Sequence, residues 1–223
     1  MNGGGPAGQD SGGGLVSLPE DPRLREPIKG VPLVFVDVET TGLSPAQGDR
    51  VCEVGLLRVC GEREEESFET LVNPGRPISA EASAVNGITD SMVRDAPPFS
   101  QVVDHVMKIL KGSILVAHNA PFDLGFLRNE LLLAGHSLPP FQVVDTLELA
   151  RRCFSFPSNS LQEICRALRI EVCGQHRALA DCRTTWKVLI YFLKVWEIRG
   201  AMSLGQILEL QRAKPVSGSG SRW

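Results

Sequence analysis

Four acidic residues and one histidine lie in three distant segments of the chain and together supply the groups that metal-assisted hydrolysis needs. Asp37 and Glu39 occur in LVFVDVETTGL, Asp123 in ILVAHNAPFDLGFL, and His176 with Asp181 in HRALAD. Carboxylate oxygens suit Mg²⁺ and Mn²⁺, and imidazole titrates near neutral pH. Two such ions, about 3.5–4 Å apart, can hold a phosphodiester, activate water and stabilise the leaving oxygen. The set therefore predicts hydrolysis of a phosphodiester by two Mg²⁺ or Mn²⁺ ions, with neutral His176 as general base.

Each of these segments also has a plainer interpretation. Asp37 and Glu39 are two apart on an expected strand, so they share a face at the strand end where ligands of α/β sheets bind. The same pair also fits a strand that simply runs into a polar turn. Asp123, in the first turn of an expected helix, could instead compensate the helix dipole. Phe122 could stack on a base or pack in the core, and His118 is expected beside the site.

The composition fits one domain of ordinary size. The chain has 223 residues, of which 43% are apolar, and this is enough for a core. Its net charge of −3 argues against a broad basic surface for nucleic acid, although bound metal would offset the acids of the site. The six cysteines form no CxxC pair and are expected to be structural thiols. The sequence contains no recognisable signal peptide or membrane span, so we expect a cytoplasmic protein with no membrane partner.

Composition also divides the chain into three parts. Residues 1–30 are rich in glycine and proline and are expected to form a flexible leader. Residues 31–199 are expected to form one continuous catalytic domain. Residues 200–223 predict a short helix followed by a flexible tail.

The hydrophobic periodicity predicts an α/β fold. Three apolar runs predict an antiparallel meander, and the acidic run 62–66 is expected at a solvated hairpin tip rather than at a site. Helices and strands then alternate, which indicates a mixed sheet flanked by helices, and Ser160 with Glu163 predicts a capping box. The expected strands are Leu33–Val38, Arg50–Val59, Ser67–Val72, Ile114–Ala117 and Gln142–Val144; the expected helices are Phe99–Leu110, Asn119–Ala134, Thr146–Arg152, one starting at Ser160, and Arg177–Trp196.

The three segments resemble the motifs of the DEDDh 3′–5′ exonucleases of the DnaQ-like type, a family that includes the proofreading ε subunit of bacterial DNA polymerase III. FVDVETTGL resembles the first motif of that family, HNAPFDLGFL the second, and HRALAD the third, with five residues from histidine to aspartate. VDTLELAR and NPGRPISAEASAVNGIT are similar to further segments of the bacterial members. The resemblance covers roughly residues 33–196.

This resemblance implies a ribonuclease H-like fold with a five-stranded mixed sheet, in which the first three strands are antiparallel. It implies release of nucleoside monophosphates from a 3′ end. By motif position, the metal ligands are Asp37, Glu39, Asp123 and Asp181, and the general base is His176. The implied pocket for the terminal nucleotide consists of Thr40, Thr41, Gly42 and Leu43, with His118, Asn119 and Phe122 opposite.

The expected substrate is a single-stranded or frayed 3′ end of DNA, in proofreading or repair. An exoribonuclease of the oligoribonuclease or RNase T type is the alternative, because contacts to the 2′-hydroxyl cannot be read from a sequence. A binding module without catalysis is disfavoured because no motif position is lost. A DNA polymerase is one candidate partner. However, residues 199–213 lack the glutamine-led, aromatic-ended motif with which the ε subunit binds the sliding clamp, so a stand-alone nuclease fits as well.

Overall fold

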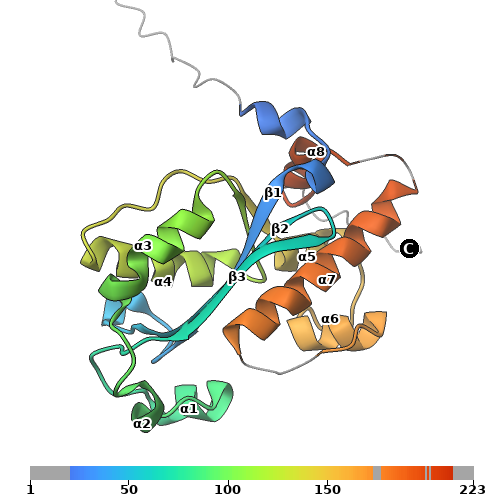
Figure 1. Cartoon of the computed structure of the whole chain (residues 1–223). Helices are drawn as coiled ribbons and strands as arrows, with labels where there is room; N and C mark the ends of the chain where they lie inside the picture. The colour runs from blue at the N-terminus through green and yellow to red at the C-terminus, as the bar shows by residue number, and fades with distance from the viewer. Residues whose placement is uncertain (1–20, 173–176, 199, 201, 213–223) are drawn as a thin grey trace, which may run out of the picture.

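The computed structural model describes residues 21–172, 177–198, 200 and 202–212. Within them, helices surround one sheet (Figure 1). None of the helices in these ranges has the length and hydrophobicity needed to cross a bilayer. With η for 3₁₀-helices, the elements in chain order are η1 (Pro22–Arg25), η2 (Ile28–Gly30), β1 (Pro32–Thr40), η3 (Pro45–Gln47), β2 (Val51–Cys60), β3 (Arg63–Leu71), α1 (Ala80–Asn86), α2 (Asp90–Val93), α3 (Phe99–Leu110), β4 (Ile114–Ala117), α4 (Ala120–Leu133), β5 (Val143–Asp145), α5 (Thr146–Cys153), α6 (Leu161–Leu168), α7 (Ala178–Glu197) and α8 (Leu204–Leu210).

The sheet has five strands in the order β3-β2-β1-β4-β5. β1 pairs antiparallel with β2, and β2 with β3, whereas β4 is parallel to both β1 and β5. The antiparallel part follows from short connections, while the parallel strands need helical crossovers such as α4. The predicted mixed sheet with three antiparallel strands first is confirmed.

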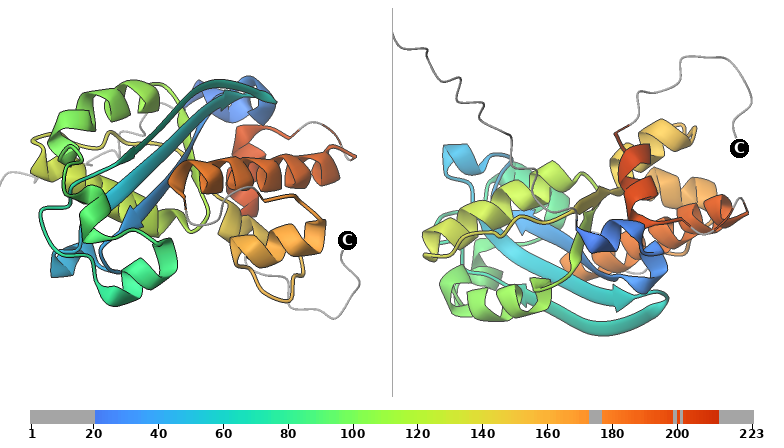
Figure 2. Two further views of the ribbon diagram at one scale, coloured as in Figure 1. Left: turned by 60° about the horizontal axis from the view of Figure 1, so that its bottom comes forward. Right: turned by 90° about the horizontal axis from the view of Figure 1, so that it is seen from above.

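Helices cover both faces of the sheet, which explains why β1 is apolar on both sides. Leu33 and Phe35 of β1 pack in one core cluster together with residues of α7. Val34 and Val36 pack in a second cluster together with residues of α3 and α4. Figure 2 shows α7 and the α3–α4 pair on opposite sides of the strands. Since side chains two apart share a face, the odd-numbered positions of β1 face α7 along the whole strand.

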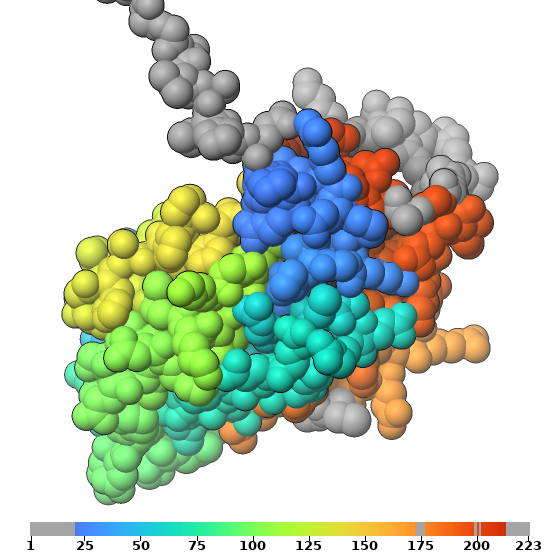
Figure 3. Space-filling model, turned by 45° about the horizontal axis from the view of Figure 1, so that its top comes forward, coloured from blue at the N-terminus to red at the C-terminus, as the bar shows by residue number. Residues whose placement is uncertain are grey.

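The first and last described segments pack against each other at one end of the sheet. Ile28 N donates to Met202 O at 3.0 Å, and Leu204 N donates to Glu26 O at 3.0 Å. Ile28 is buried. In Figure 3 the blue N-terminal residues lie beside the red C-terminal ones. Residues 21–30, which we expected in a flexible leader, are therefore ordered; residues 1–20 and 213–223 lie outside the described residues, and the domain limits stay a prediction.

The third strand begins earlier than predicted. Arg63 already pairs with Cys60 in the β2–β3 register, so only Gly61 and Glu62 form the tip of the hairpin. The prediction that residues 62–66 form the tip was therefore wrong for 63–66. Charged side chains are compatible with this strand because it is at the edge of the sheet and partly in water. Hydrophobic alternation alone could not find such a strand.

Two short helices, α1 and α2, were not predicted. Ser79 caps α1, since its Oγ accepts a hydrogen bond from Ala82 N at 3.0 Å, and Gly87 ends it with a φ of 69°. A serine before and a glycine after a short segment are the usual helix boundaries. These two signals could have located α1 in the sequence.

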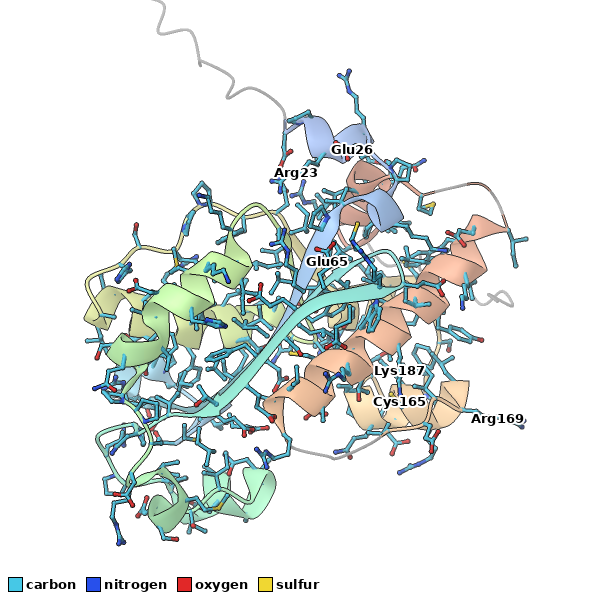
Figure 4. All side chains as sticks on the ribbon, in the orientation of Figure 1. Arg23, Glu26, Glu65, Cys165, Arg169 and Lys187 are labelled. Carbon is cyan, nitrogen blue, oxygen red and sulfur yellow. The ribbon has the colours of Figure 1, made fainter. Side chains whose placement is uncertain are left out.

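The predicted capping box at α6 is only half formed. Ser160 Oγ accepts a hydrogen bond from Glu163 N at 3.4 Å, but Ser160 N donates to Ser158 Oγ at 3.3 Å, and the Glu163 side chain pairs with Arg166 instead. The helix is nevertheless in place against α7. Figure 4 shows Cys165 on the side of α6 toward α7.

Candidate active site

Asp37, Glu39 and Asp181 meet at the end of β1. One carboxylate oxygen from each residue lies within 4.8 Å of the others. Asp37 and Glu39 occupy odd-numbered positions of β1 and so face α7, whose first turn carries Asp181. The prediction that the first two share a face is confirmed, and the third approaches them from a segment more than a hundred residues away.

A glycine on β2 allows α7 to come this close. Gly55 pairs with Asp37 in the β1–β2 register. A Cβ at Gly55 would lie 2.4 Å from the carbonyl carbon of Ala178, so no larger residue fits there without moving the helix. Cys182 Sγ also lies 3.4 Å from the carbonyl oxygens of both Phe35 and Gly55. This direct contact between β2 and the first turn of α7 holds Asp181 beside Asp37.

Asp123 reaches the same end of β1 from the other face of the sheet. It lies in the first turn of α4 and is 4% exposed. Its Oδ1 accepts a hydrogen bond from Val38 N at 3.1 Å, and Val38 stands between Asp37 and Glu39 in the strand. The structure therefore brings all four predicted acids to one strand end.

A further aspartate, Asp145, fixes the start of α4. Its carboxylate accepts hydrogen bonds from Asn119 N and Ala120 N, both at 3.1 Å, and from Leu147 N at 2.9 Å. Asn119, the residue before α4, has a φ of 79°. Asp145 thus caps α5 and also holds the N-terminus of the helix that carries Asp123. The sequence signal for this was an aspartate directly before a helix, to which we had assigned no role.

Burial and mutual repulsion raise the pKa of the clustered acids. Burial raises the pKa of Glu39 from 4.5 to about 7, and the charges of Asp181 and Glu53 add to the rise. Burial also raises the pKa of Asp123 from 3.8 to about 8. Burial, and then the neighbouring carboxylates, raise the pKa of Asp37 well above 3.8. Carboxylates crowded in this way disfavour their charged forms, and a bound cation would reverse that effect. The donor set is all oxygen, so it fits a hard divalent ion such as Mg²⁺ or Mn²⁺.

Two adjoining cavities open at the acid cluster. One has a volume of about 350 Å³ and the other about 320 Å³, and they share Val38, Glu39 and Phe122 in their walls. The first is also lined by Asp37, His118, Asp123, Ser160, Leu161, Gln162 and Asp181. The second is also lined by Thr40, Gly42, Leu43, Ser79, Glu81, Ala82, Val85 and Asn86. All four acids therefore line the first, more polar cavity, and Glu39 also lines the second, more apolar one.

Five of the seven residues predicted around the terminal nucleotide line these cavities, and two do not. Thr41 is 1% exposed; its Oγ1 lies 3.3 Å from Asp49 Oδ1 and accepts a hydrogen bond from Arg50 N at 3.1 Å. Asn119 is exposed but is not among the residues that line either cavity. Both residues shape the backbone beside the cavities. Thr41 anchors the loop after β1, and Asn119 precedes the first residue of α4.

His118 forms part of the wall of the first cavity, as predicted. Its Nδ1 lies 2.9 Å from Thr146 Oγ1, and its Nε2 lies 2.9 Å from the backbone oxygen of Asn159. Burial lowers its pKa. Because both ring nitrogens have partners within the protein, His118 is a fixed wall residue.

Helix α1 supplies residues that the sequence analysis did not find. Val85, 62% exposed, and Leu43, 84% exposed, both line the second cavity. Asn86 is buried there, and its Nδ2 donates to Thr40 O at 3.2 Å. Val85 and Asn86 lie in a segment that we had linked to the family only by its sequence pattern, whereas Leu43 lies in the first motif and was predicted.

The predicted general base, His176, lies outside the described residues. Its neighbour Arg177 is described and directly precedes α7.

The whole domain can be compared with known proteins. A model of the exonuclease family, of the RNase T type, matches residues 34–189. The chain belongs to this exonuclease family. The exonuclease domain is 38% identical over 187 residues to a DNA polymerase III subunit epsilon-like protein of Rhodobacter capsulatus, a match that covers 82% of this chain and 26% of the relative. It is 36% identical over 162 residues to the 3′-5′ exonuclease DinG of Bacillus subtilis, a match that covers 72% of this chain and 17% of the relative. The matches thus span about a quarter or less of each relative's length.

A solved structure, exonuclease X in complex with 5′ overhanging duplex DNA, has the same fold. The TM-score is 0.64 with 27% sequence identity, and the match covers 80% of this chain and 99% of the other. The resemblance to DnaQ-like DEDDh exonucleases and the predicted ribonuclease H-like fold are therefore confirmed.

Proposed function

We propose that this exonuclease domain removes nucleoside monophosphates from the 3′ end of DNA with the help of divalent cations. The observation that carries the proposal is the meeting of Asp37, Glu39 and Asp181 within 4.8 Å, with Asp123 bonded to the backbone between the first two. These acids come from three motifs that only the fold brings together. Their arrangement suits cleavage of a phosphodiester, whose charge needs cations nearby.

In this proposal Asp37, Glu39, Asp123 and Asp181 hold two Mg²⁺ or Mn²⁺ ions. The raised pKa values of Glu39 and Asp123 support it, because burial, and after it the neighbouring carboxylates, disfavour the charged forms, and a bound cation would offset both effects. When bound, the cations polarise the scissile phosphate and activate a water molecule. The protein orients the acids in three ways: by their positions on β1, by the hydrogen bond from Val38 N to Asp123, and by the close packing of α7 against Gly55.

The general base in this proposal is His176. Its assignment rests on the sequence, in which it precedes Asp181 by five residues. A neutral imidazole can accept the proton of the attacking water at physiological pH. No other histidine has comparable support, since His118 has protein partners at both ring nitrogens.

The terminal nucleotide would occupy the two cavities, with its phosphate at the acids. Leu43 and Val85 line the cavity of about 320 Å³ and are largely exposed, so a base between them would shield apolar surface from water. Phe122 lines both cavities, and Thr40, Gly42 and His118 complete the walls. Thr41 and Asn119 would contribute by holding the backbone of these walls.

The relatives support DNA as the substrate. The Rhodobacter capsulatus relative is named for a DNA polymerase III subunit, and exonuclease X was solved with duplex DNA. An exoribonuclease remains the alternative outcome of the test, because discrimination depends on contacts to the 2′-hydroxyl. A proofreading or repair role, a polymerase partner and a cytoplasmic location stay predictions.

The proposal can be tested with a 5′-labelled single-stranded DNA and Mg²⁺. We expect a ladder that shortens from the 3′ end, with nucleoside monophosphate as the released product. EDTA and the variant Asp37→Ala should abolish it, whereas Asp104→Asn, an exposed charge change on α3, should not. Monophosphate release that survives EDTA or Asp37→Ala would refute the metal-dependent mechanism. An RNA of the same sequence that is degraded faster than the DNA would assign the alternative substrate.

A further inference from the structure

Glu53 is a fully buried carboxylate on β2, a strand that carries none of the predicted catalytic residues. It is 0% exposed and stands directly opposite Glu39 in the β1–β2 register. Glu53 and Gly55 are two apart, so both face α7. A buried charge costs free energy unless it is paired and hydrogen-bonded, so the partners of Glu53 indicate what it does.

Among the residues that the structure describes, the hydrogen-bond partners of Glu53 lie at the start of α7. Arg177 Nη2 lies 2.7 Å from Glu53 Oε1, and Arg177 Nε donates to the same oxygen at 2.9 Å. Ala178 N, the first backbone donor of α7, donates to Glu53 Oε2 at 2.9 Å. The N-cap residue Arg177 makes no side-chain cap of its own. Glu53, on β2, therefore caps the N-terminus of α7. The helix dipole favours a negative charge at this end of the helix.

This cap connects directly to a predicted metal ligand. Asp181 N donates to Arg177 O at 3.0 Å. Glu53 therefore holds the side chain of Arg177, and the backbone oxygen of Arg177 accepts the hydrogen bond from Asp181 in the first turn of α7. Gly55, two residues further along β2, allows α7 to pack this close, because a Cβ there would lie 2.4 Å from the carbonyl carbon of Ala178. Glu53 and Gly55 thus fix the position and the start of the helical turn that carries Asp181.

We propose that Glu53 is a positioning residue for the metal site: through Arg177 and Ala178 it sets the distance of Asp181 from Asp37 and Glu39. The inference rests on the proposed function, in which these acids hold the cations. It assigns the rigidity of the acid cluster to a residue that is not itself a ligand. Groups that orient metal ligands in this way typically contribute about 10–100-fold to metal affinity.

The chain contains a matched control for Glu53. Glu130, on α4, is 1% exposed, and its Oε1 and Oε2 accept hydrogen bonds from Arg50 Nε and Nη2, each at 2.7 Å. Its Oε1 also accepts a hydrogen bond from Val51 N at 3.1 Å. Glu130 therefore has the same chemistry as Glu53: a buried carboxylate, one arginine fork and one backbone N–H. Its bonds tie α4 to the start of β2 and do not involve α7.

The experiment measures Mn²⁺ binding by titration calorimetry in the full chain, for the wild type and for Glu53→Gln, Arg177→Lys and Glu130→Gln. We expect Glu53→Gln to weaken Mn²⁺ binding about 10–100-fold. Arg177→Lys keeps the charge but loses the fork, and we expect a smaller loss of Mn²⁺ affinity. Glu130→Gln should bind Mn²⁺ as the wild type does, although its melting temperature falls. In nuclease assays, Glu53→Gln should need a higher Mg²⁺ concentration for half-maximal rate and recover most of its rate at saturating Mg²⁺.

The melting temperature of each variant separates positioning from general loss of stability. If Glu53→Gln does not fold, the Mn²⁺ affinity of Arg177→Lys tests the inference. This variant is expected to fold, because the Arg177 side chain is 48% exposed and the substitution keeps its charge. The inference is overturned if the folded variants of Glu53 and Arg177 bind Mn²⁺ with wild-type affinity, or if Glu130→Gln weakens binding equally. A wild type that binds Mn²⁺ but degrades no nucleic acid would refute the proposed function alone. A wild type that binds no Mn²⁺ would refute both.

Discussion

Replacing Glu39 by glutamine should stabilise the metal-free protein at alkaline pH. In the folded state, burial and the charges of Asp181 and Glu53 raise the pKa of Glu39 from 4.5 to about 7. A carboxyl group with a raised pKa stabilises the fold while it is protonated. That stability is fully present below about pH 4.5 and is lost as the pH rises through about 7. Glutamine keeps the shape of the side chain and does not titrate in this range.

The magnitude follows from the two pKa values. A pKa rise from 4.5 to about 7, at about 1.4 kcal/mol per pH unit, corresponds to a loss of about 3 kcal/mol from the free energy of unfolding of the wild type. Partial exposure of Glu39 reduces this loss to about 2–3 kcal/mol. The stability of Glu39→Gln relative to the wild type should therefore increase by this amount between about pH 4.5 and pH 8.

Divalent cations should reverse the order of stability. A ligand that binds only the folded state stabilises it according to its concentration and affinity. In millimolar Mg²⁺ at pH 8 the wild type should gain stability, and Glu39→Gln, which lacks one proposed ligand, should gain less. Urea unfolding followed by circular dichroism, at several pH values in EDTA and in Mg²⁺, measures both effects.

The control is Asp104→Asn, which removes an exposed carboxylate on α3. Its stability relative to the wild type should stay nearly constant over the same pH range. A constant difference between Glu39→Gln and the wild type from pH 4.5 to pH 8 in EDTA would refute the reasoning that burial and crowding raise the pKa of Glu39.

Three further predictions concern the proposed general base, the packing of α7 on β2 and the second cavity. His176→Ala should slow turnover about 10²–10⁴-fold while calorimetry still detects Mn²⁺ binding; unchanged turnover would remove His176 from the mechanism. Gly55→Ala should destabilise the fold by about 1–3 kcal/mol in urea unfolding, because its Cβ would lie 2.4 Å from Ala178; a stability equal to that of the wild type would show that α7 can shift freely. Leu43→Ser, at a position 84% exposed, should leave the melting temperature unchanged and raise KM for a DNA oligomer about tenfold with little change in kcat; an unchanged KM would exclude Leu43 from the nucleotide pocket.

The sequence predicted the central part of the fold well. β1 was predicted as a buried strand because its apolar residues continue without alternation, and the structure packs both of its faces under helices. β3 was predicted too short because Arg63–Glu66 are charged, and charge on an edge strand looks like a turn. Helices α1 and α2 were missed because they are too short for a hydrophobic period to show.

For the site, the sequence predicted the chemical groups better than their surroundings. Thr41 lies within the first motif, yet its side chain is buried against Asp49, which local sequence order could not reveal. Val85 was missed because it lies in a segment without ionisable groups that point to chemistry. Glu53 was missed because no role can be assigned to an acidic residue within an apolar strand until its partner is known. That partner, Arg177, is 124 positions away in the chain.

The sequence by itself determined which ligands the protein offers and that Asp37 and Glu39 share a face, because residue types and the two-residue period of a strand are local properties. Only the tertiary structure decided that Asp181 lies within 4.8 Å of them. That distance depends on how α7 packs on β2, through the missing side chain of Gly55 and the buried carboxylate of Glu53. Such contacts join residues far apart in the chain, so no local pattern specifies them.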